Sequence, residues 1–444
     1  IRKLLMTSWG LIKETDRDSY SNKRIDLAGS LLYELYRELW GSFQKNISLI
    51  IDRKYKFDFK AYGNDITNLI TDTNREKIFN STILDTIIKS FGSVFGTKLS
   101  GRQGIVQDLN RNVMLGTLSH LRRLSFPLDK GSTITGPRKL HNSQWGFVCP
   151  TESPDGSNTG IINHLSFLSQ VSSNISEIGI IDALIDLNMI PLSSISHEDL
   201  YHVCKIFLNG KWIGIHTEPL YLQKIMRLLK LNSIIHFHTS LYWNIENNEY
   251  YVFTDAGRIL RPVLVLKNRD GKKTNDLIEK DYSSAECWQS LLRGHMYDIQ
   301  GEYSPLDPTY YRDELLKIQK DYPDFEEYLE HKQGKIEYID PLESEGFMIS
   351  KDIYSIHSIE NYTHSEIHPS LILSAVALNI PFPEHSQYPR NVFSCQQTKQ
   401  AVGVFSSAYN TRFDTFAHIL NYPQKPIVTT RYKKYTDVDK LSYG

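Results

Sequence analysis

The sequence has few cysteines, and none of them is paired in the sequence. Cys149, Cys204, Cys287 and Cys395 lie far apart among 444 residues, and no C-x2-C pair occurs. A zinc ribbon needs such pairs, and a disulfide framework is typical of short, cysteine-rich secreted chains. We therefore expect free thiols in a reducing compartment, with neither a zinc ribbon nor a disulfide framework.

The chain also lacks long apolar runs. No stretch reaches the roughly 18–20 consecutive apolar residues that a membrane span requires, and no charged-then-apolar leader opens the sequence. With 40% hydrophobic and 23% charged residues, the composition predicts a folded, soluble, intracellular protein without a membrane partner. Because the chain begins at Ile1 rather than at methionine, we expect it to be a piece of a longer polypeptide.

The chain also has almost no net charge and lacks the common catalytic motifs. Formal net charge is −1, from 50 basic and 51 acidic side chains, so nucleic-acid contact would depend on local basic patches. No P-loop, G-x-G-x-x-G, H-E-x-x-H or serine-nucleophile elbow occurs. His236 and His238 alternate in IIHFH, which we read as a strand with both rings on one side. No third ligand follows at metal-site spacing, so we expect no metal site in this chain.

Apolar periodicity predicts a helical N-terminal part. Apolar residues recur every four positions along one long stretch, as they do on one face of an amphipathic helix. A second helical pattern runs from Ile83 to Phe91 and leads into a loop marked by Gly92, Gly96 and Gly101. The residues of the first stretch are Leu27, Leu31, Leu35, Leu39, Phe43 and Ile47.

Beyond about residue 200 the pattern becomes mixed. Two short apolar runs flank Asn209-Gly210, which predicts a β-hairpin. Thr217 is expected to cap a helix with Pro219 in its first turn. From Ile367 onward, prolines break the apolar clusters and predict largely irregular chain. The fold class that follows is α+β with several domains.

Two groups of basic residues stand on Gly-rich or Pro-rich segments. Cations on such loops suit phosphate contact, although solvated surface is the simpler interpretation, and the residues alone leave both open. The first group is Arg102, Arg111, Arg122, Arg123, Lys130, Arg138 and Lys139, and the second is Arg390, Lys399, Arg412, Lys425 and Arg431.

Residues 145–156, WGFVCPTESPDG, combine a thiol, two acids, two prolines and a glycine. Cys149 has no His or Cys at ligand spacing, so we expect it to be a small buried residue. The prolines and Gly156 indicate a rigid turn that positions Glu152.

Several stretches, in order, resemble one protein family. The segment TLSHLRRLSFPLDKGSTITGPRKLHNSQWGFVCPTESPDGSNTG resembles the fork region of the second-largest, beta-type subunit of multisubunit DNA-directed RNA polymerases. Its eukaryotic, archaeal and large-DNA-virus branch fits best. The similar stretches are Thr15–Gly29, Thr117–Gly160, Phe253–Pro262, Glu337–Glu345, Glu366–Ser370, Ile380–Asn391 and Lys399–Arg431.

This resemblance implies an order of domains. The order agrees with the helical, glycine-rich, mixed α+β and proline-rich parts of the chain described above. The end of the lobe and the protrusion helices would occupy residues 1–90, and the fork residues 91–165. External domains 1 and 2 would occupy 166–365, and the N-terminal part of the hybrid-binding domain 366–444.

The resemblance also implies roles for individual residues. Arg390 would contact the triphosphate of the incoming NTP, and Glu152 would be the fork carboxylate beside the substrate pore. Lys399 and Gln400 would hold RNA near its growing end. Fork loops would span Gly92–Gly101 and Lys130–Pro137. Nucleic-acid contacts are expected from Arg122, Arg123, Lys130, Arg138, Lys399, Gln400, Arg412 and Lys425.

Partners and cofactor follow from the same resemblance. They are the largest subunit and other polymerase subunits, a DNA template, an RNA transcript and NTPs, in a nucleus, a cytoplasmic viral factory or a virion. Mg²⁺ would be bound mainly by the largest subunit. We expect the family's own Glu-Asp pair to follow residue 444, so this chain alone would not be an enzyme.

The sequence departs from the family pattern in three places. SPDG at Ser153–Gly156 replaces the usual TPEG, Phe393 stands where cellular relatives often have Tyr, and SCQQT at Ser394–Thr398 replaces small residues. An alternative is a non-catalytic nucleic-acid-binding or assembly module derived from the same subunit.

Overall fold

The computed structural model divides the chain into two units. One comprises Ile1–Ile25 and Asn110–Gly444, and the other comprises Asp26–Leu109. Both helices and mixed sheets are present, which confirms the predicted α+β, multidomain fold class. The structure describes residues 1–57, 71, 75, 78–79, 82–91, 94–95, 102–128, 131–196, 203–269, 272–274, 287–300, 308–352, 361–436 and 438.

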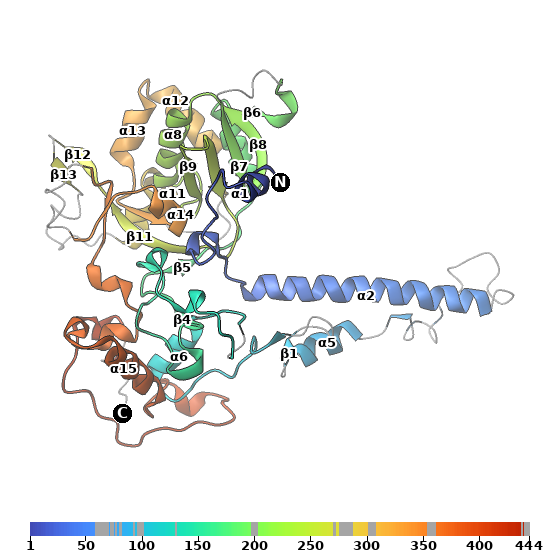
Figure 1. Cartoon of the computed structure of the whole chain (residues 1–444), viewed down its shortest axis with the longest axis vertical. Coiled ribbons are helices and arrows are strands. Elements are labelled where there is room, and N and C mark those ends of the chain that lie inside the picture. The colour runs from blue at the N-terminus through green and yellow to red at the C-terminus, as the bar shows by residue number, and fades with distance from the viewer. Residues whose placement is uncertain are drawn as a thin grey trace. The chain divides into compact units, whose positions relative to one another are not determined.

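The smaller unit is built on one long helix, α2 (Ala28–Phe57) (Figure 1). The predicted stripe is confirmed, because Leu35 is buried, Leu31, Leu39, Phe43 and Ile47 are half-buried, and most neighbouring side chains are exposed. Helix α5 (Thr82–Ser90) contacts α2 and confirms the second helical prediction. Strands β1 (Val94–Phe95) and β2 (Arg102–Gln103) pair beyond it. Gly92, Gly96 and Gly101, which mark the expected loop, lie outside the described residues.

In the larger unit, the middle of the chain forms a five-stranded sheet in the order β6-β8-β7-β10-β9. The predicted hairpin is confirmed, since β7 and β8 are antiparallel and Asn209 and Gly210 take φ of 47° and 82°. These positive angles suit the short turn that an Asn-Gly pair favours. The strands are β6 (Ile190–Pro191), β7 (Cys204–Leu208), β8 (Lys211–His216), β9 (Ser240–Asn244) and β10 (Glu249–Phe253).

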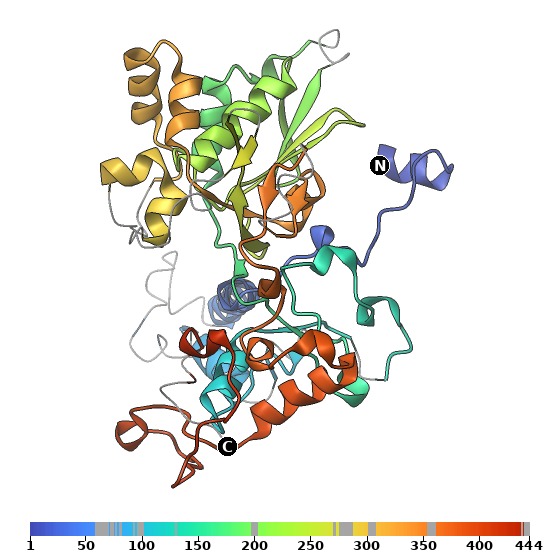
Figure 2. The same ribbon diagram turned by 90° about the vertical axis from the view of Figure 1, so that its left-hand side faces the viewer.

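Helices cover one side of this sheet (Figure 2). Helix α8 (Pro219–Leu231) buries Leu222, Ile225, Met226 and Leu229 completely in the shared core. Pro219 lies in its first turn as predicted, but the N-cap is Glu218, so the prediction that Thr217 caps the helix was wrong. The other helices of this layer are α7 (Glu177–Asp186), α11 (His295–Gln300), α12 (Arg312–Asp321) and α13 (Phe325–Lys332).

The run IIHFH is not a strand. Ser233 takes a φ of 55°, the Ile234 N–H donates to Leu229 O, and the chain turns at Phe237 and His238 before β9 begins. A helix C-terminus of this kind interrupts the alternation that a strand would need. The strand prediction for His236 and His238 was therefore wrong.

A second sheet, ordered β14-β11-β16-β15 with β5 also paired to β11, brings distant motifs together. Every residue of β11 is buried. The motif ILRP lies in β11, β14 ends at the Ile of EYID, and β16 immediately precedes Glu366. The strands are β5 (Gln170–Val171), β11 (Ile259–Val265), β14 (Ile336–Ile339), β15 (Ile349–Ser350) and β16 (His364–Ser365).

The rest of the larger unit is mostly irregular chain around two helices, α6 (Met114–Leu121) and α15 (Tyr388–Gln400). Among the described residues after Ile367, the helical elements are short 3₁₀ turns and α15 and the rest is irregular, which confirms the prediction from the prolines. Other elements are α1 (Arg2–Ser8), β3 (Arg123–Ser125), β4 (Ile162–His164), β12 (Lys267–Arg269), β13 (Lys272–Thr274), α10 (Trp288–Arg293) and α14 (Pro341–Glu345).

Candidate nucleic-acid interface

Helices α6 and α15 approach each other closely. A Cβ added at Gly116 of α6 would meet the carbonyl oxygen of Lys399 at 3.3 Å, and Asn110 Nδ2 donates to the same oxygen at 3.5 Å. The Gly403 N–H donates to Asn112 O at 3.0 Å. The absence of a side chain at Gly116 therefore lets the end of α15 rest on the start of α6.

Apolar side chains fill the space between these helices. Leu115, Cys149, Val376 and Cys395 are buried in one cluster with Leu373, Ala377, Leu378 and Val438. Cys149 is a buried free thiol, as predicted, and the Glu152 N–H donates to its sulfur at 3.4 Å. Burial, reinforced by the Glu152 charge, raises the pKa of Cys395 far above its ordinary value. This thiol is therefore a packing group.

Glu152 is the centre of a buried polar group that we call the Glu152 cluster: Ser119, Glu152, His164 and Lys399. The Glu152 side chain is 1% exposed. Its Oε1 accepts from Ser119 Oγ at 2.5 Å, and lies 3.3 Å from Lys399 Nζ and 3.6 Å from His164 Nε2. The cluster joins the Thr117–Gly160 segment to α15 by charge as well as by packing.

The protonation states in this cluster follow from its geometry. Burial alone would raise the pKa of Glu152, but His164, Lys399, and the hydroxyls of Ser119 and Ser374 hold it below its ordinary value. Burial lowers the pKa of His164 to about 4, despite the nearby Glu152 carboxylate. His164 is thus neutral at pH 7, with Nδ1 donating to Glu152 O at 2.9 Å. The result is a carboxylate paired with an ammonium beside a neutral imidazole.

Such a carboxylate is suited to holding a cation in place. A general acid or base at neutral pH needs a pKa near 7 and a free path to its substrate. Glu152 has a lowered pKa and an oxygen already bound by Ser119 and Lys399. The arrangement therefore fixes the position of the Lys399 ammonium.

Helix α15 presents a different set of side chains on its open side. Arg390, Phe393, Gln397 and Gln400 are exposed, whereas Lys399 is 5% exposed. Successive helical residues turn by about 100°, so Arg390 and Lys399, nine positions apart, point to opposite sides. The Arg390 guanidinium lies over the Phe393 ring, 5.8 Å from its centroid. We call Arg390, Phe393, Gln397 and Gln400 the open face of α15.

Two of the predicted nucleic-acid contacts, Arg122 and Arg123, bind within the protein. Arg122 Nη2 donates to the carbonyl oxygens of Ser166, Phe167 and Ser169 at 2.6, 3.1 and 3.0 Å. Arg123 Nε lies 3.4 Å from His164 Nε2. Burial lowers the pKa of both guanidinium groups, against the attraction of Glu152. Both arginines lie beside the Glu152 cluster.

The remaining predicted cations that the structure describes make no contact with this cluster. Arg138 Nη1 donates to Ser157 O at 2.8 Å and to Thr159 O at 3.0 Å, which ties one loop to the next. Arg412 pairs with Asp414 at 2.8 Å, and Lys425 is exposed on irregular chain. Lys130 lies outside the described residues.

The motif that begins at Thr15 packs against the loop before Gly146. His141 Nε2 lies 2.6 Å from Asp16 Oδ2, and the Tyr20 N–H donates to Ser143 Oγ at 2.8 Å. Gln144 Nε2 donates to the Tyr20 hydroxyl at 3.0 Å. The backbone hydrogen bond to Asp18 and the bond to His141 lower the pKa of Asp16. The motif that begins at Thr15 and the loop before Gly146 thus pack against each other, although they are distant in sequence.

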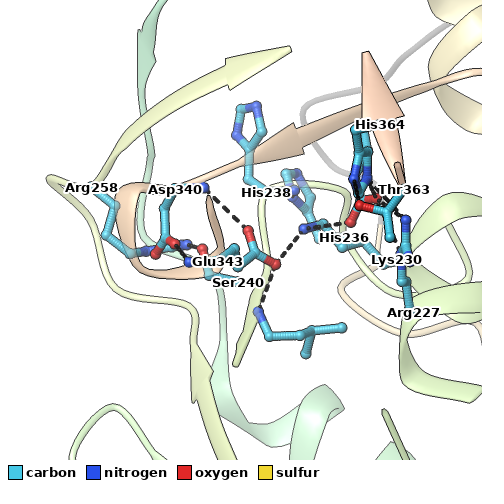
Figure 3. Close-up of polar contacts among 12 residues, drawn as sticks. Arg227, Lys230, His236, His238, Ser240, Arg258, Asp340, Glu343, Thr363 and His364 are labelled. Carbon is cyan, nitrogen blue, oxygen red and sulfur yellow. Dashed lines mark hydrogen bonds and ion pairs between the residues drawn. The ribbon is translucent and has the colours of Figure 1, made fainter. Parts of the chain in front are cut away.

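A second buried polar group lies in the middle region, and we call it the Lys230 network: Arg227, Lys230, Glu337, Glu343 and His364 (Figure 3). Lys230 Nζ lies 2.8 Å from Glu343 Oε1 and 3.3 Å from Glu337 Oε1. Glu337 Oε2 also lies 3.2 Å from Arg227 Nη2 and 3.0 Å from His364 Nε2.

Helix capping supports this network. Asp340 and Glu343 form a capping box at the start of α14, and Glu343 Oε1 also accepts from the Leu241 N–H at 2.8 Å. Burial, with Asp340 and Glu337 nearby, raises the pKa of Glu343 to about 7, although Lys230 opposes this. Within the part of the chain that the structure describes, no group of three or more His, Cys, Asp and Glu side chains forms a metal site.

Sequence reasoning missed Ser119 and His164. Ser119 follows the buried Leu115 by four positions, so helical spacing could have placed it on the inner face of α6. No sequence pattern distinguishes His164, because its importance comes from the contact between β4 and the Glu152 backbone. Of the predicted residues, the structure brings together Glu152 and Lys399, with Arg122 and Arg123 beside them.

No helix among the described residues is long and apolar enough to cross a membrane.

Family models match three parts of the chain. They are described as RNA polymerase Rpb2 domain 3, domain 4 and domain 6, and they match residues 107–171, 206–267 and 376–444. The first covers α6 and Glu152, and the third covers α15.

Named relatives match along nearly the whole chain. DNA-directed RNA polymerase II subunit RPB2 of Eremothecium gossypii is 33% identical over all of the chain, which covers 36% of that relative. DNA-directed RNA polymerase II subunit 2 of Arabidopsis thaliana is 33% identical, with 100% of the chain and 34% of the relative covered. DNA-directed RNA polymerase subunit 2 of Acanthamoeba polyphaga mimivirus is 31% identical, with 95% and 34% covered. The chain thus spans about a third of the length of these relatives.

Proposed function

Because the chain belongs to the family of second-largest subunits of multisubunit DNA-directed RNA polymerases, we propose that it is part of an enzyme that extends RNA with NTPs on a DNA template. Its partners are then the largest subunit, other polymerase subunits, template DNA and the transcript. Such an enzyme works in a nucleus or in a viral factory or virion. The segment contributes to the reaction only within the assembled complex.

The observation that carries this proposal is the open face of α15, supported from behind by the Glu152 cluster. Arg390 is exposed on this face, and its guanidinium lies over the Phe393 ring. A guanidinium can bind two phosphate oxygens at once and offset charge that develops on a pyrophosphate leaving group. We assign Arg390 to the triphosphate of the incoming NTP, with Gln400 on the same face toward RNA.

Lys399 has a conditional role in this proposal. Its ammonium contacts Glu152 and lies beneath the open face, so it reaches an RNA phosphate only when this ion pair opens. Glu152 therefore limits how strongly Lys399 attracts nucleic acid. We therefore keep the contact between Lys399 and the RNA–DNA hybrid that the family resemblance implies. Glu152 has the role of positioning Lys399.

Cations on the loops supply the remaining contacts; Arg412 and Lys425 are exposed and Arg138 is half-buried. Arg138, Arg412 and Lys425 suit backbone phosphates, which bind cations without regard to sequence. Arg122 and Arg123 act through the shape of the site, since their guanidinium groups bind carbonyl oxygens and His164. We keep the assignment of Lys130 to the fork loop as a proposal.

We also propose the domain boundaries at residues 90, 165 and 365 that the family resemblance implies.

The described residues do not fit a Mg²⁺ site. Magnesium prefers oxygen ligands that are free to coordinate it, whereas Glu152 is taken up by Lys399 and Ser119, and the described residues hold no suitable cluster. We therefore place the Mg²⁺ of the reaction mainly in the largest subunit.

Reconstitution of the complete polymerase with Arg390→Ala tests the proposal. Because each factor of ten corresponds to about 1.4 kcal/mol, loss of a charged phosphate contact should lower kcat/KM for NTP at least about tenfold. Single-nucleotide extension of RNA on a template scaffold measures this. Arg312→Ala is the matched control, since Arg312 is also exposed but pairs with Asp186 at 2.6 Å, away from α15.

Three outcomes separate the possibilities. A normal kcat/KM in Arg390→Ala would remove Arg390 from the NTP site. An equal loss in Arg312→Ala would show a general defect. A wild-type complex that binds nucleic acid but extends no RNA would favour the alternative of a non-catalytic binding or assembly module.

A further inference from the structure

Arg261 is a buried cation in β11 that the proposed function leaves without a role. Its side chain is 6% exposed, and its Nη1 lies 2.5 Å from Glu366 Oε1. The guanidinium also lies over the Phe147 ring, 5.1 Å from the centroid. Arg261 therefore connects three separate motifs: ILRP in β11, EIHPS after β16, and WGF before Glu152.

Gly146 is shaped to receive this guanidinium. Its φ is +75°, and a Cβ at this position would meet Arg261 Nη1 at 2.5 Å and Cδ at 2.8 Å. Only a residue without a side chain both adopts this angle easily and leaves room for Arg261. Ser169 Oγ donates to Gly146 O at 2.9 Å and holds the other side of the turn.

A short series of contacts links this turn to Glu152. The Ser166 N–H donates to Phe147 O at 3.0 Å, and the Cys149 N–H donates to His164 O at 2.9 Å. His164 Nδ1 in turn bonds Glu152 O at 2.9 Å. Phe147 and Cys149 are buried, so this backbone has little room to shift independently.

We propose that Arg261 and Glu366 are positioning residues, which set the Glu152 carboxylate against Lys399 by clamping Gly146 and Phe147. Neither residue belongs to the Glu152 cluster, so both act through the backbone between them. When the clamp is weakened, Glu152 holds Lys399 less firmly, and the Lys399 ammonium becomes more available to phosphate. This inference rests on the proposed function, because it deepens the role given there to Glu152 and Lys399.

The test uses the complete polymerase assembled on a synthetic template–RNA scaffold. The affinity for the scaffold is measured as a function of salt, because each additional phosphate contact steepens the dependence of log K on log salt by about one. Glu152→Gln should steepen the slope by about one, and Glu366→Gln by about half to one. Glu152→Gln/Glu366→Gln should match Glu152→Gln alone, because residues that act through one contact are not additive.

Glu337→Gln is the matched control. It removes a buried, ion-paired carboxylate that is less exposed than Glu366 from β14, the strand beside β11, and Glu337 takes no part in the contacts between Arg261 and Glu152. A slope changed as much by Glu337→Gln as by Glu366→Gln would overturn the proposal, as would an additive double variant or an unchanged slope in Glu366→Gln.

Smaller changes keep the test decisive if Glu366→Gln fails to assemble. Arg261→Lys keeps the charge but loses the planar group over Phe147, and Phe147→Leu keeps an apolar side chain but loses the ring. Both should steepen the slope in the same direction, and a wild-type slope in both would overturn the clamp. RNA extension by the wild type is recorded separately, so its absence counts against the proposed function while the salt data still judge the clamp.

Discussion

Lys230 and Lys399 are both buried lysines paired with carboxylates, yet their surroundings differ. Lys230 lies between two carboxylates, Glu337 and Glu343, and its side chain is 1% exposed. Lys399 has one, Glu152, and lies beneath the open face of α15. A buried charge costs free energy unless it is paired and hydrogen-bonded, so both pairs are needed.

The difference teaches which pair can take part in function. The Lys230 network is closed, since α8, β14, α14 and β16 supply its members, and the side chains of Lys230, Glu337 and Glu343 are each 1% exposed. The Glu152 cluster joins two distant segments, and Lys399 precedes the exposed Gln400 at the end of α15. The ion pairs of the Lys230 network therefore stabilise the fold, whereas the Lys399–Glu152 pair can exchange its partner.

The largest expected effect comes from breaking the closed network. Lys230→Met leaves Glu337 and Glu343 without their shared cation, which should lower the free energy of local unfolding by about 3–5 kcal/mol. Hydrogen exchange of the α8 amides in the full-length subunit measures this. Lys224→Met is the control, because Lys224 pairs with Glu326 at 2.8 Å on the surface and should cost less than about 1 kcal/mol. Equal losses in both variants would contradict the distinction.

The pH dependence of the closed network should be the next effect in size. The pKa of Glu343 is raised to about 7, so its contribution to stability is fully present below its ordinary value near 4.5 and is lost as pH rises through 7. At about 1.4 kcal/mol per pKa unit, the loss is of the order of 3 kcal/mol at most. Exchange of the α14 and β9 amides between pH 4.5 and 8 would show it.

Glu343→Gln sharpens this prediction, because a permanently neutral amide cannot lose a proton. The decline in stability between pH 4.5 and 7 should become shallower in the variant. An unchanged decline would mean that another group is responsible. Glu337 contributes with the opposite sign, since Arg227, Lys230 and His364 outweigh burial and hold its pKa below the ordinary value.

The smallest expected effect concerns stability at the Glu152 cluster. Glu152→Gln keeps the hydrogen bond from Ser119 and removes only the charge, so local stability near α6 should fall by about 1–2 kcal/mol. This is less than for Lys230→Met, because Glu152→Gln leaves one buried ion, Lys399, without its partner, whereas Lys230→Met leaves two buried carboxylates without theirs. Exchange of the α6 amides measures the loss, and a loss as large as in Lys230→Met would show that the cluster is closed after all.

Much of the fold could be predicted from local patterns. The four-residue spacing from Leu27 to Ile47 located α2, which begins at Ala28, and Asn209-Gly210 located the hairpin, because both signals depend on neighbours in sequence. The same reasoning failed at IIHFH, where the end of α8 and the positive φ of Ser233 override the alternation. It also placed the cap of α8 one residue early.

The candidate site was predictable only in part. Family resemblance pointed to Glu152, Arg390 and Lys399, but not to the depth of Glu152 or to the opposite directions of Arg390 and Lys399 on α15. Those depend on which side of the helix meets α6, a contact between segments far apart in sequence. The roles of Ser119 and His164 come from the same long-range packing.

Helix α15 can also be considered as a constraint on evolution. Because it rises about 1.5 Å and turns about 100° per residue, it fixes Arg390 about 14 Å from Lys399 along its axis and on the opposite side. A substitution within it changes one side chain, whereas a single inserted or deleted residue would rotate Arg390 away from its direction. Lineages of this family should therefore accept substitutions in α15, such as SCQQT, and accept length changes only in the irregular chain that follows it.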